Sequence, residues 1–459
     1  MASAIERLRI SAACALTLAI FWVLSGCVQG TGKSSATDKQ PKVTVSSTGA
    51  VADGTTLCTE AIRKAIEQCA ATGGGTVLFP KGVYFTGAVA LKSNITLQLD
   101  EGATLKFSTE PKDYPLVRTR WEGVEIQNYS PLIFAAGCEN VAIRGKGTID
   151  GQGKAWWDWA NKRQSAYGKL YNGTTTKSGA QPDDRVFGEK NAGLRPSLVE
   201  FYDCKHVLVE GVTLRESPCW TIHPVYSEDV TIRGVTIVGT GPNTDGIDPD
   251  SCQQVLIEKC TLDTGDDCVA IKSGRDHDGR RVGKICENVV VRNCLMKGGY
   301  AGVAIGSETA GGVRHVLVED CVFDGTRTGV RMKTTRGRGG VVEDIVYRYI
   351  TMRNISEMAI SINMKYGHND DESVAKKDES TPVFRDILLE RLTVESAASA
   401  GKIIGLAESP VERITLRDAT IHAKTGMVVR DVAGLKKENG KTVVESGEAW
   451  NIRNGAEIK

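Results

Sequence analysis

The sequence predicts an all-β protein, a right-handed parallel β-helix with a capping helix near its amino terminus. A run of segments from residue 138 onward repeats one pattern: two polar residues, an alternating apolar triplet, a polar or glycine turn and a second short apolar strand. The starts at 204 and 227 lie 23 residues apart, and those at 313 and 342 lie 29 apart. Parallel strands joined by helices need longer connections, so stacked coils remain. The 50 glycines and 6% aromatic residues suit tight turns between short strands.

Each repeated segment is expected to supply the first two strands of one coil. The long intervals after 138 and after 342 predict loops inserted between strands. In the longest insertion, residues 151–196, we expect Trp156, Trp157 and Trp159 to pack the loop onto the solenoid rather than to stack on sugar rings. The repeats start at Cys138, Cys204, Ser227, Cys252, Cys286, Val313, Val342, Phe384 and Val411.

The cysteines do not form a pattern of metal ligands. The chain has 13, and no CxxC pair occurs among them, which argues against a zinc site. Most fall at fixed positions of the repeat. We therefore expect stacked, buried and inert thiols rather than a disulfide framework.

One helix is predicted before the repeats. Apolar residues recur at helical spacing between Thr59 and Cys69, and the glycines at 73–75 end the pattern. A solenoid exposes a sheet edge at its end, so this helix is expected to cap it.

The amino terminus resembles a bacterial lipoprotein signal. Arg7 and Arg9 precede an apolar stretch that ends at Leu24, followed by Ser25, Gly26 and Cys27. We expect a signal peptide at 1–26, lipidation of Cys27, a tether at 27–42 and a single domain at 43–459. Because Val28 rather than an aspartate follows the lipidated cysteine, we expect the protein in the outer membrane of a bacterial cell envelope. The alternatives are an ordinary secretory signal and an uncleaved anchor.

The overall charge gives no reason to expect a nucleic-acid partner. The chain has 57 basic and 56 acidic residues, a formal net charge of +1. We expect a monomer whose only membrane contact is its lipid.

Three carboxylates form the strongest candidate for a catalytic centre. Asp245 and Asp266 are 21 residues apart, close to one repeat, so stacked coils place Asp245 beside Asp266 and Asp267 at roughly 5 Å in the stacking direction. Adjacent residues cannot both face out of a regular strand. Asp266 and Asp267 must therefore lie at a strand end or a bend.

A third strand in each coil predicts an outward polar row beside these acids. Alternation places residues such as Val269, Ile271 and Met332 in the core, which turns their neighbours outward. The outward residues of successive coils are His223, Asp248, Lys272, Arg331, Lys333 and Asn363. Small residues form the expected floor of this groove: Gly246, Ala270, Ala304 and Gly306.

Several ordered motifs resemble the polygalacturonase family, glycoside hydrolase family 28. They are Asn243-Thr-Asp245, Gly265-Asp-Asp267, Arg331-Met-Lys333 and the later Tyr366, with residues 53–87 and 271–283 similar to bacterial members. The resemblance covers about residues 44–425. It implies a pectin-lyase-like solenoid and a pectic or other uronic-acid polysaccharide as substrate, without cofactor or metal.

The resemblance also implies roles for the residues. An inverting glycosidase needs one protonated acid and a carboxylate that activates water. Asp266 is then the general acid, and Asp245 with Asp267 activates the water. Arg331 and Lys333 suit a sugar carboxylate. Further expected substrate contacts are Tyr366, His223, Tyr300, Lys272 and Asn243.

One position departs from the family pattern. Gly299-Tyr300-Ala301 stands where these enzymes usually have Gly-His-Gly. Tyr300 offers a hydroxyl in place of the imidazole. Polygalacturonase activity, endo or exo, is the main expectation; hydrolysis of rhamnogalacturonan or another uronic-acid polysaccharide is the alternative.

Other classes of function stay open on the residues alone. A polysaccharide lyase would need an Arg or Lys base and usually calcium, which fits the three acids less well. A non-catalytic carbohydrate-binding β-helix would use the same groove without turnover, and the acids would then be turn formers.

Overall fold

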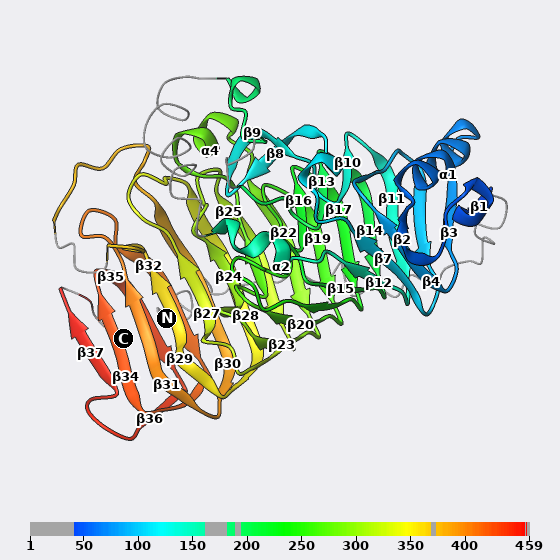
Figure 1. Ribbon diagram of the computed structural model, residues 1–459. Helices are drawn as coiled ribbons and strands as arrows, with labels where there is room; N and C mark the ends of the chain where they lie inside the picture. Colours follow the sequence, from blue (N-terminus) through cyan, green and yellow to red (C-terminus); the bar gives the residue numbers. More distant parts are fainter. Residues whose placement is uncertain (1–40, 161–180, 189–193, 369–372, 455, 457–459) are drawn as a thin grey trace, which may run out of the picture. The chain divides into compact units, whose positions relative to one another are not determined.

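The described chain winds into a parallel β-helix, which confirms the predicted fold class (Figure 1). The computed structural model describes residues 41–160, 181–188, 194–368, 373–454 and 456, all within the unit 41–459. The predicted signal peptide, Cys27 and most of the tether lie outside the described residues. Strand β1 begins at Lys42, one residue before the predicted domain boundary.

The strands form three rows along the solenoid, and two of these rows share one 24-stranded sheet. The first row is β1 (Lys42–Thr44), β3 (Gly75–Phe79), β6 (Ile95–Leu99), β11 (Glu139–Gly145), β14 (Lys205–Glu210), β17 (Glu228–Arg233), β19 (Gln253–Glu258), β22 (Cys286–Arg292), β25 (Val313–Glu319), β28 (Val341–Arg353), β30 (Val383–Val394), β32 (Val411–Arg417) and β35 (Val432–Glu438). The second row is β2 (Asp53–Leu57), β4 (Gly82–Thr86), β7 (Ala103–Phe107), β12 (Thr148–Asp150), β15 (Thr213–Arg215), β18 (Thr236–Val238), β20 (Thr261–Thr264), β23 (Leu295–Gly298), β26 (Val322–Asp324), the ends of β28 and β30, β33 (Thr420–Ala423) and β36 (Lys441–Val444).

The third row carries the predicted polar residues and is split into two sheets. The four-stranded part is β5 (Val89–Ala90), β10 (Ile133–Ala136), β13 (Val199–Tyr202) and β16 (Ile222–Val225). The seven-stranded part is β21 (Val269–Ile271), β24 (Ala301–Gly306), β27 (Thr328–Lys333), β29 (Ile355–Asn363), β31 (Ala397–Ile404), β34 (Thr425–Arg430) and β37 (Trp450–Arg453). Single-residue bridges at Ile247 and Asp250 join the two parts. The coil that carries Asp245 is therefore irregular.

The repeated segments form stacked coils because their apolar triplets pair in register from one coil to the next. Val207, Val230, Val255 and Val289 are paired in turn through β14, β17, β19 and β22, and all are buried. The residue just before the triplet turns the chain with a positive φ, as at His206 (55°). Polar residues tolerate this left-handed conformation better than β-branched ones, which explains the polar positions of the pattern.

Charges on the outer side of the first row also follow the stacking. Positions in register alternate in sign through Glu210, Arg233, Glu258, Arg292 and Glu319. Arg233 and Arg292 both contact Glu258, at 2.6 and 2.8 Å. Each such surface pair contributes up to about 1 kcal/mol, and the alternation also avoids stacking like charges.

Helix α1 (Thr59–Ala71) lies where the capping helix was predicted (Figure 1). Its apolar stripe, Ile62, Ala65, Ile66 and Cys69, is buried against the first coils. The described cysteines are buried free thiols, as predicted. Among the described parts of the chain, no helix is both long and apolar enough to span a membrane.

The repeat pattern missed coils at both ends and a hairpin over the third row. β8 (Leu116–Trp121) and β9 (Val124–Tyr129) form an antiparallel pair in the segment between β7 and β10. The remaining elements are short: α2 (Lys154–Trp157), α4 (Asp276–Val282), η2 (Val45–Thr48), η3 (Pro111–Asp113) and η4 (Pro182–Asp184).

Candidate active site

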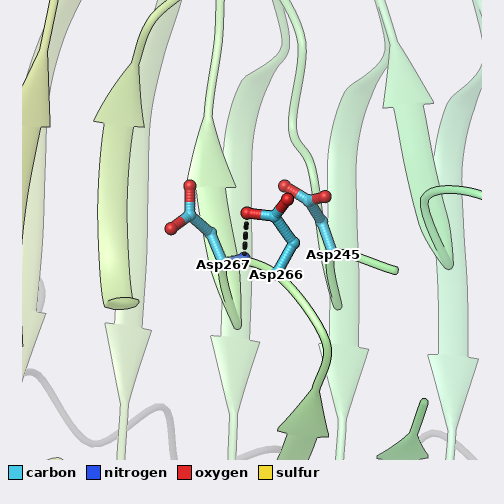
Figure 2. Close-up of side chains that lie close together, drawn as sticks. All are labelled: Asp245, Asp266 and Asp267. Carbon is cyan, nitrogen blue, oxygen red and sulfur yellow. Dashed lines mark hydrogen bonds between the residues drawn. The ribbon is translucent and has the colours of Figure 1, made fainter. Parts of the chain in front are cut away.

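The three predicted acids lie together on adjacent coils (Figure 2). Asp266 and Asp267 occupy the bend between β20 and β21, as their adjacency required, and Asp245 lies in the irregular coil before it. Carboxylate oxygens of all three fall within 4.8 Å of one another. The Gly246 amide donates to the carbonyl of Asp267 at 3.0 Å, which fixes the register between the two coils.

Asp267 is held as an anion. Its side chain is buried, and its two oxygens accept hydrogen bonds from Lys333 Nζ at 2.7 Å and Arg331 Nη1 at 2.9 Å. Burial favours the neutral carboxyl, but Lys333 and Arg331 outweigh it and lower the pKa of Asp267. The site thus keeps one fixed carboxylate at neutral pH.

Asp266 and Asp245 behave in the opposite way. Burial and then the neighbouring Asp267 raise the pKa of Asp266. Burial and then Asp266 raise the pKa of Asp245 well above its usual value. Asp266 is partly exposed while Asp245 is 3% exposed, so Asp266 is the raised-pKa acid that a ligand reaches more easily.

Lys272 links these acids to a second set of carboxylates. Its ammonium lies 4.0 Å from Asp245, 3.5 Å from Asp248 and 3.4 Å from Glu308, and 4.4 Å from the Trp220 ring centroid. The side chain is 3% exposed. Carboxylates and Trp220 thus enclose the Lys272 ammonium beside Asp245, and its expected contact with the substrate stays a prediction.

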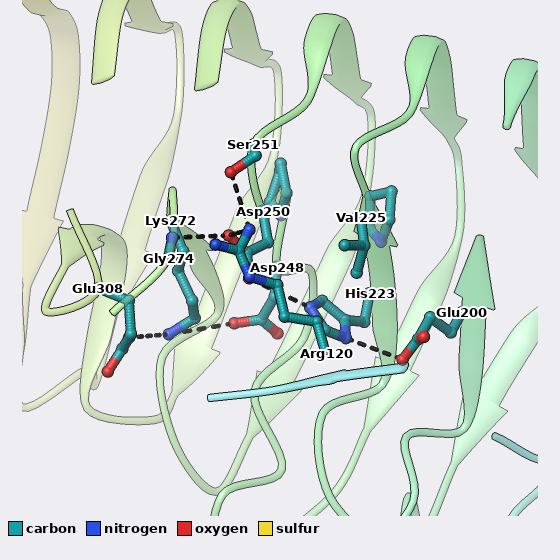
Figure 3. A network of polar contacts seen from close by, with 12 residues as sticks. Arg120, Glu200, His223, Val225, Asp248, Asp250, Ser251, Lys272, Gly274 and Glu308 are labelled. Carbon is teal, nitrogen blue, oxygen red and sulfur yellow. Dashed lines mark hydrogen bonds and ion pairs between the residues drawn. The ribbon is translucent and has the colours of Figure 1, made fainter. Parts of the chain in front are cut away.

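His223 is also covered (Figure 3). It faces away from the core as predicted, but it is 0% exposed and lies between Glu200, at 3.2 Å, and Asp250, at 3.7 Å. Burial opposes a charge on the imidazole, but Asp250 and Glu200 outweigh it and raise the pKa of His223 to about 9. Its expected place as a substrate contact is wrong, because the β8–β9 hairpin covers this part of the third row.

The hairpin is clamped to the coils by buried polar contacts (Figure 3). Arg120 donates to Asp250 at 2.9 Å and to Ser251 at 2.8 Å, and Thr119 donates to Glu200 at 2.6 Å. At the tip, the Arg275 amide donates to the carbonyl of Gly123. The hairpin therefore covers the third row from Glu200 to Arg275, beyond the strand that follows Asp266 and Asp267.

We expect Arg120→Met to lower the free energy of unfolding by about 3–5 kcal/mol, because it breaks the buried ion pair with Asp250 and leaves His223, 3.7 Å away, as the remaining cation beside that carboxylate. Denaturant unfolding followed by circular dichroism measures this change. Arg118→Met is the matched control on the same strand: its side chain is 44% exposed and 3.4 Å from Glu125, and we expect a cost below about 1 kcal/mol. Equal effects of the two substitutions would contradict the clamp.

Aromatic side chains stand at the rim on the other side of the acids. Tyr300 and Tyr366 are 37% and 39% exposed. The Arg331 guanidinium lies 5.7 Å from each ring centroid, and Arg327 lies 4.2 Å from that of Tyr300. Both tyrosines therefore flank the cation that holds Asp267, on a side open to solvent.

The other predicted residues have structural contacts. Asn243 accepts a hydrogen bond from Arg195 at 2.7 Å. Trp156 is buried against Trp159, as expected, while Trp157 packs on Gly241 beside the turn that carries Asp245. Ala270 and Ala304, two of the residues expected to floor the groove, are fully buried and pack with Ala301.

Sequence reasoning missed Arg120, Glu200, Asp250 and Glu308. Glu200 lies in register with His223, and the alternation of Val199 and Phe201 could have placed it on the same outward row. Nothing comparable in the sequence places Arg120, which reaches Asp250 across 130 positions of the chain.

A metal ion has candidate ligands in the three acids themselves. Within the part of the chain that the structure describes, Asp245, Asp266 and Asp267 are the group of oxygens near enough to share one ion. Lys333, Arg331 and Lys272 already supply positive charge there. The three acids and these three cations are therefore the groups that can transfer protons and hold charge in the site.

Comparison with known sequences agrees with this geometry. The profile of the family described as Glycosyl hydrolases family 28 matches residues 69–439. A probable polygalacturonase of Vitis vinifera is 34% identical over 404 residues, covering 84% of this chain and 76% of that protein. An endo-polygalacturonase of Pectobacterium carotovorum subsp. carotovorum is 29% identical, covering 88% and 93%.

Solved structures agree as well. A hyperthermoactive exopolygalacturonase from Thermotoga maritima superposes with a TM-score of 0.79 at 39% identity, covering 91% of this chain and 92% of that one. The polygalacturonase of Erwinia carotovora ssp. carotovora gives a TM-score of 0.63 at 25% identity, covering 94% and 99%. A β-helix with three clustered acids, a profile match over most of the domain and these relatives together place the chain in glycosyl hydrolase family 28, the polygalacturonase family, as a glycosidase.

Proposed function

We propose that the protein hydrolyses α-glycosidic bonds of galacturonan by inversion and attacks the polymer from one chain end. The observation that carries this proposal is the acid cluster itself: Lys333 at 2.7 Å and Arg331 at 2.9 Å hold Asp267 and lower its pKa, while the pKa of the adjacent Asp266 is raised. Glycoside hydrolysis needs one charged and one protonated carboxyl on either side of the scissile bond.

The reaction assigns one step to each acid. Asp266 gives its proton to the glycosidic oxygen as the bond to the anomeric carbon breaks. Asp267 and Asp245 hold a water molecule, whose oxygen attacks that carbon from the other face while its proton passes to a carboxylate. Arg331 and Lys333 bind the carboxylate of the adjoining sugar.

The spacing of the acids makes stereochemistry a sharp test. Inverting glycosidases usually separate their carboxyls by about 6.5–9.5 Å and retaining ones by about 5 Å. Oxygens here lie within 4.8 Å, but Asp267 is held by two cations rather than free to attack carbon. Proton NMR of the first product formed decides: the β-anomer supports inversion, and the α-anomer contradicts it.

The hairpin supports the proposal of attack from a chain end. β8 and β9 cover Glu200, His223 and Asp250 on one side of the acids, while the rim at Tyr300 and Tyr366 stays exposed on the other. A polymer that enters from the open side meets this wall. Only the glycosidic bond nearest the end of the polymer chain can then reach Asp266.

Tyr300 bears on the choice of substrate. It stands at the rim where family members usually have a histidine, with Arg327 against its ring. A tyrosine offers a hydroxyl and an aromatic face but no charge at neutral pH. We propose that galacturonan remains the substrate because Arg331 and Lys333, which suit a uronic acid, are both present.

Digestion of polygalacturonan and rhamnogalacturonan in parallel tests this proposal. We expect short products from polygalacturonan at the earliest times, with little loss of viscosity. A mixture of long products would indicate internal attack. Release of products from rhamnogalacturonan alone would indicate that rhamnogalacturonan is the substrate. An unsaturated product that absorbs in the ultraviolet would indicate a lyase.

We also propose that Cys27 carries a lipid that anchors the enzyme to a bacterial outer membrane. The support is the sequence Leu24-Ser-Gly-Cys27 after an apolar stretch. Cys27→Ser should move the protein from the membrane fraction to the soluble fraction, as an immunoblot measures. Membrane retention of the variant would argue for an uncleaved anchor.

A further inference from the structure

Asp245 follows a turn of irregular backbone. Strand β18 ends at Val238, and this coil joins the third row through single-residue bridges instead of a strand. Within the turn, Asn243 has a φ of 56°, which is uncommon for residues other than glycine. The position of the Asp245 carboxylate therefore depends on how the backbone of residues 239–244 is held.

Arg195 reaches this turn from the end of the insertion 151–196. Its side chain is 1% exposed. Its Nη1 donates to the carbonyl of Pro218 at 2.8 Å and to that of Pro242 at 2.6 Å, and its Nη2 donates to Asn243 Oδ1 at 2.7 Å. All three acceptors are neutral oxygens, so the planar guanidinium acts here as a fork of donors. One side chain thus ties the turn to the coil before it.

Trp157 contacts the same turn from another part of the insertion. It is the last residue of α2, and its Nε1 donates to the carbonyl of Ser217 at 2.9 Å. Its ring atoms lie 2.0–2.4 Å from the place that a Cβ at Gly241 would take, so the indole packs directly on the Gly241 backbone. The Gly241 carbonyl in turn accepts a hydrogen bond from the Thr244 hydroxyl at 2.7 Å. The insertion therefore holds the turn at two places.

We propose that Arg195 and Trp157 are positioning residues for catalysis, which hold residues 241–243 so that Asp245 stays where it activates the attacking water. This inference rests on the proposed function, because that function gives Asp245 its role. A catalytic group displaced by about 1 Å can lose about 100-fold in rate. Side chains that lock the backbone beside such a group therefore contribute to kcat without touching the substrate.

Kinetics of Arg195→Met on galacturonan test the first contact. We expect kcat to fall about 10–100-fold and KM to change by less than about twofold, because the turn loses three hydrogen bonds while the cations that suit the sugar carboxylate are unchanged. Arg195→Lys should recover part of kcat, since an ammonium can still donate to the proline carbonyls. A folded Arg195→Met protein with the kcat of the wild type would overturn the inference.

Arg185→Met is the matched control for a merely structural effect. Arg185 lies in the same insertion and is 2% exposed, but it donates to the Glu125 carbonyl and to Asp278 rather than to the turn. We expect this substitution to lower Tm at least as much as Arg195→Met and to leave kcat within about twofold of the wild type. An equal loss of kcat in both variants would mean that Arg195 acts through stability alone.

The same substitution in an Asp245→Asn protein tests whether Arg195 acts through Asp245. Residues that act as a unit have non-additive effects, so Arg195→Met should then lower the residual kcat by less than about twofold. The same fold loss in both backgrounds would overturn the inference. Full activity of Asp245→Asn alone would instead overturn the role of Asp245 in the proposed function.

Gly241→Ala tests the second contact and keeps the buried guanidinium in place, so it applies even if Arg195→Met does not fold. The added methyl meets the Trp157 ring and should displace the turn, and we expect kcat to fall about tenfold. In a Trp157→Leu protein the smaller side chain leaves room, and Gly241→Ala should then cost less than about twofold. An unchanged kcat in Gly241→Ala, or an equal loss in both backgrounds, would contradict the positioning role of Trp157.

Discussion

Asp266→Asn is expected to lower kcat on galacturonan by about 10²–10⁴-fold, the usual contribution of a positioned general acid. Asp266 is partly exposed, and burial and Asp267 raise its pKa, so it keeps its proton to higher pH than an ordinary aspartate, and an amide has no such proton to give. In the wild type the Asp267 amide donates a hydrogen bond to Asp266 at 3.0 Å. Asparagine nearly matches the carboxyl in shape, and its side-chain oxygen can accept the same hydrogen bond. The fold and the KM should therefore change little.

Reducing-sugar release and circular dichroism measure this expectation together. Asp263→Asn is the matched control, because Asp263 lies three residues earlier on β20 and outside the acid cluster. Unchanged activity of Asp266→Asn would move the general acid to Asp245, whose pKa is also raised. Loss of activity in both variants would point to a structural effect of charge on this coil.

The stacking of coils was predictable because it depends on local pattern. Apolar alternation and the polar turn positions repeat in every coil, and register then carries Asp245 to Asp266 and Asp267. Adjacency alone required the bend at Asp266. The coil that carries Ile95 was also missed, although Ser93 and Asn94, the latter with a φ of 62°, precede an apolar alternation like that of the later coils.

The cover over the third row was not predictable in this way. Parity correctly turned His223 and Lys272 away from the core, but an outward residue is exposed only if nothing packs on it. Arg120 does pack there, and its partner Asp250 is 130 positions away. Such contacts depend on where an inserted hairpin packs onto the coils, and the periodic sequence pattern of the coils does not predict that position.

Lys333→Met is expected to lower kcat/KM by about 10²–10³-fold and to move the acid limb of the pH profile to higher pH. Lys333 Nζ lies 2.7 Å from Asp267, and after the opposing effect of burial it contributes most to the lowered pKa of that carboxyl. Asp267 acts only when ionised, so activity is present above its pKa and is lost as the pH falls through it. Without Lys333 that pKa rises, because only Arg331 and the weaker effect of Lys272 then offset burial.

The direction of the shift separates this role from simple substrate binding. If Lys333 only held the sugar carboxylate, its loss would raise KM at every pH and leave the acid limb of kcat in place. Lys436→Met, which removes an exposed charge on β35, should change neither. A fixed acid limb in Lys333→Met would mean that Arg331, at 2.9 Å, together with Lys272 suffices to keep Asp267 ionised, and Lys333 would then not be needed for the catalytic charge.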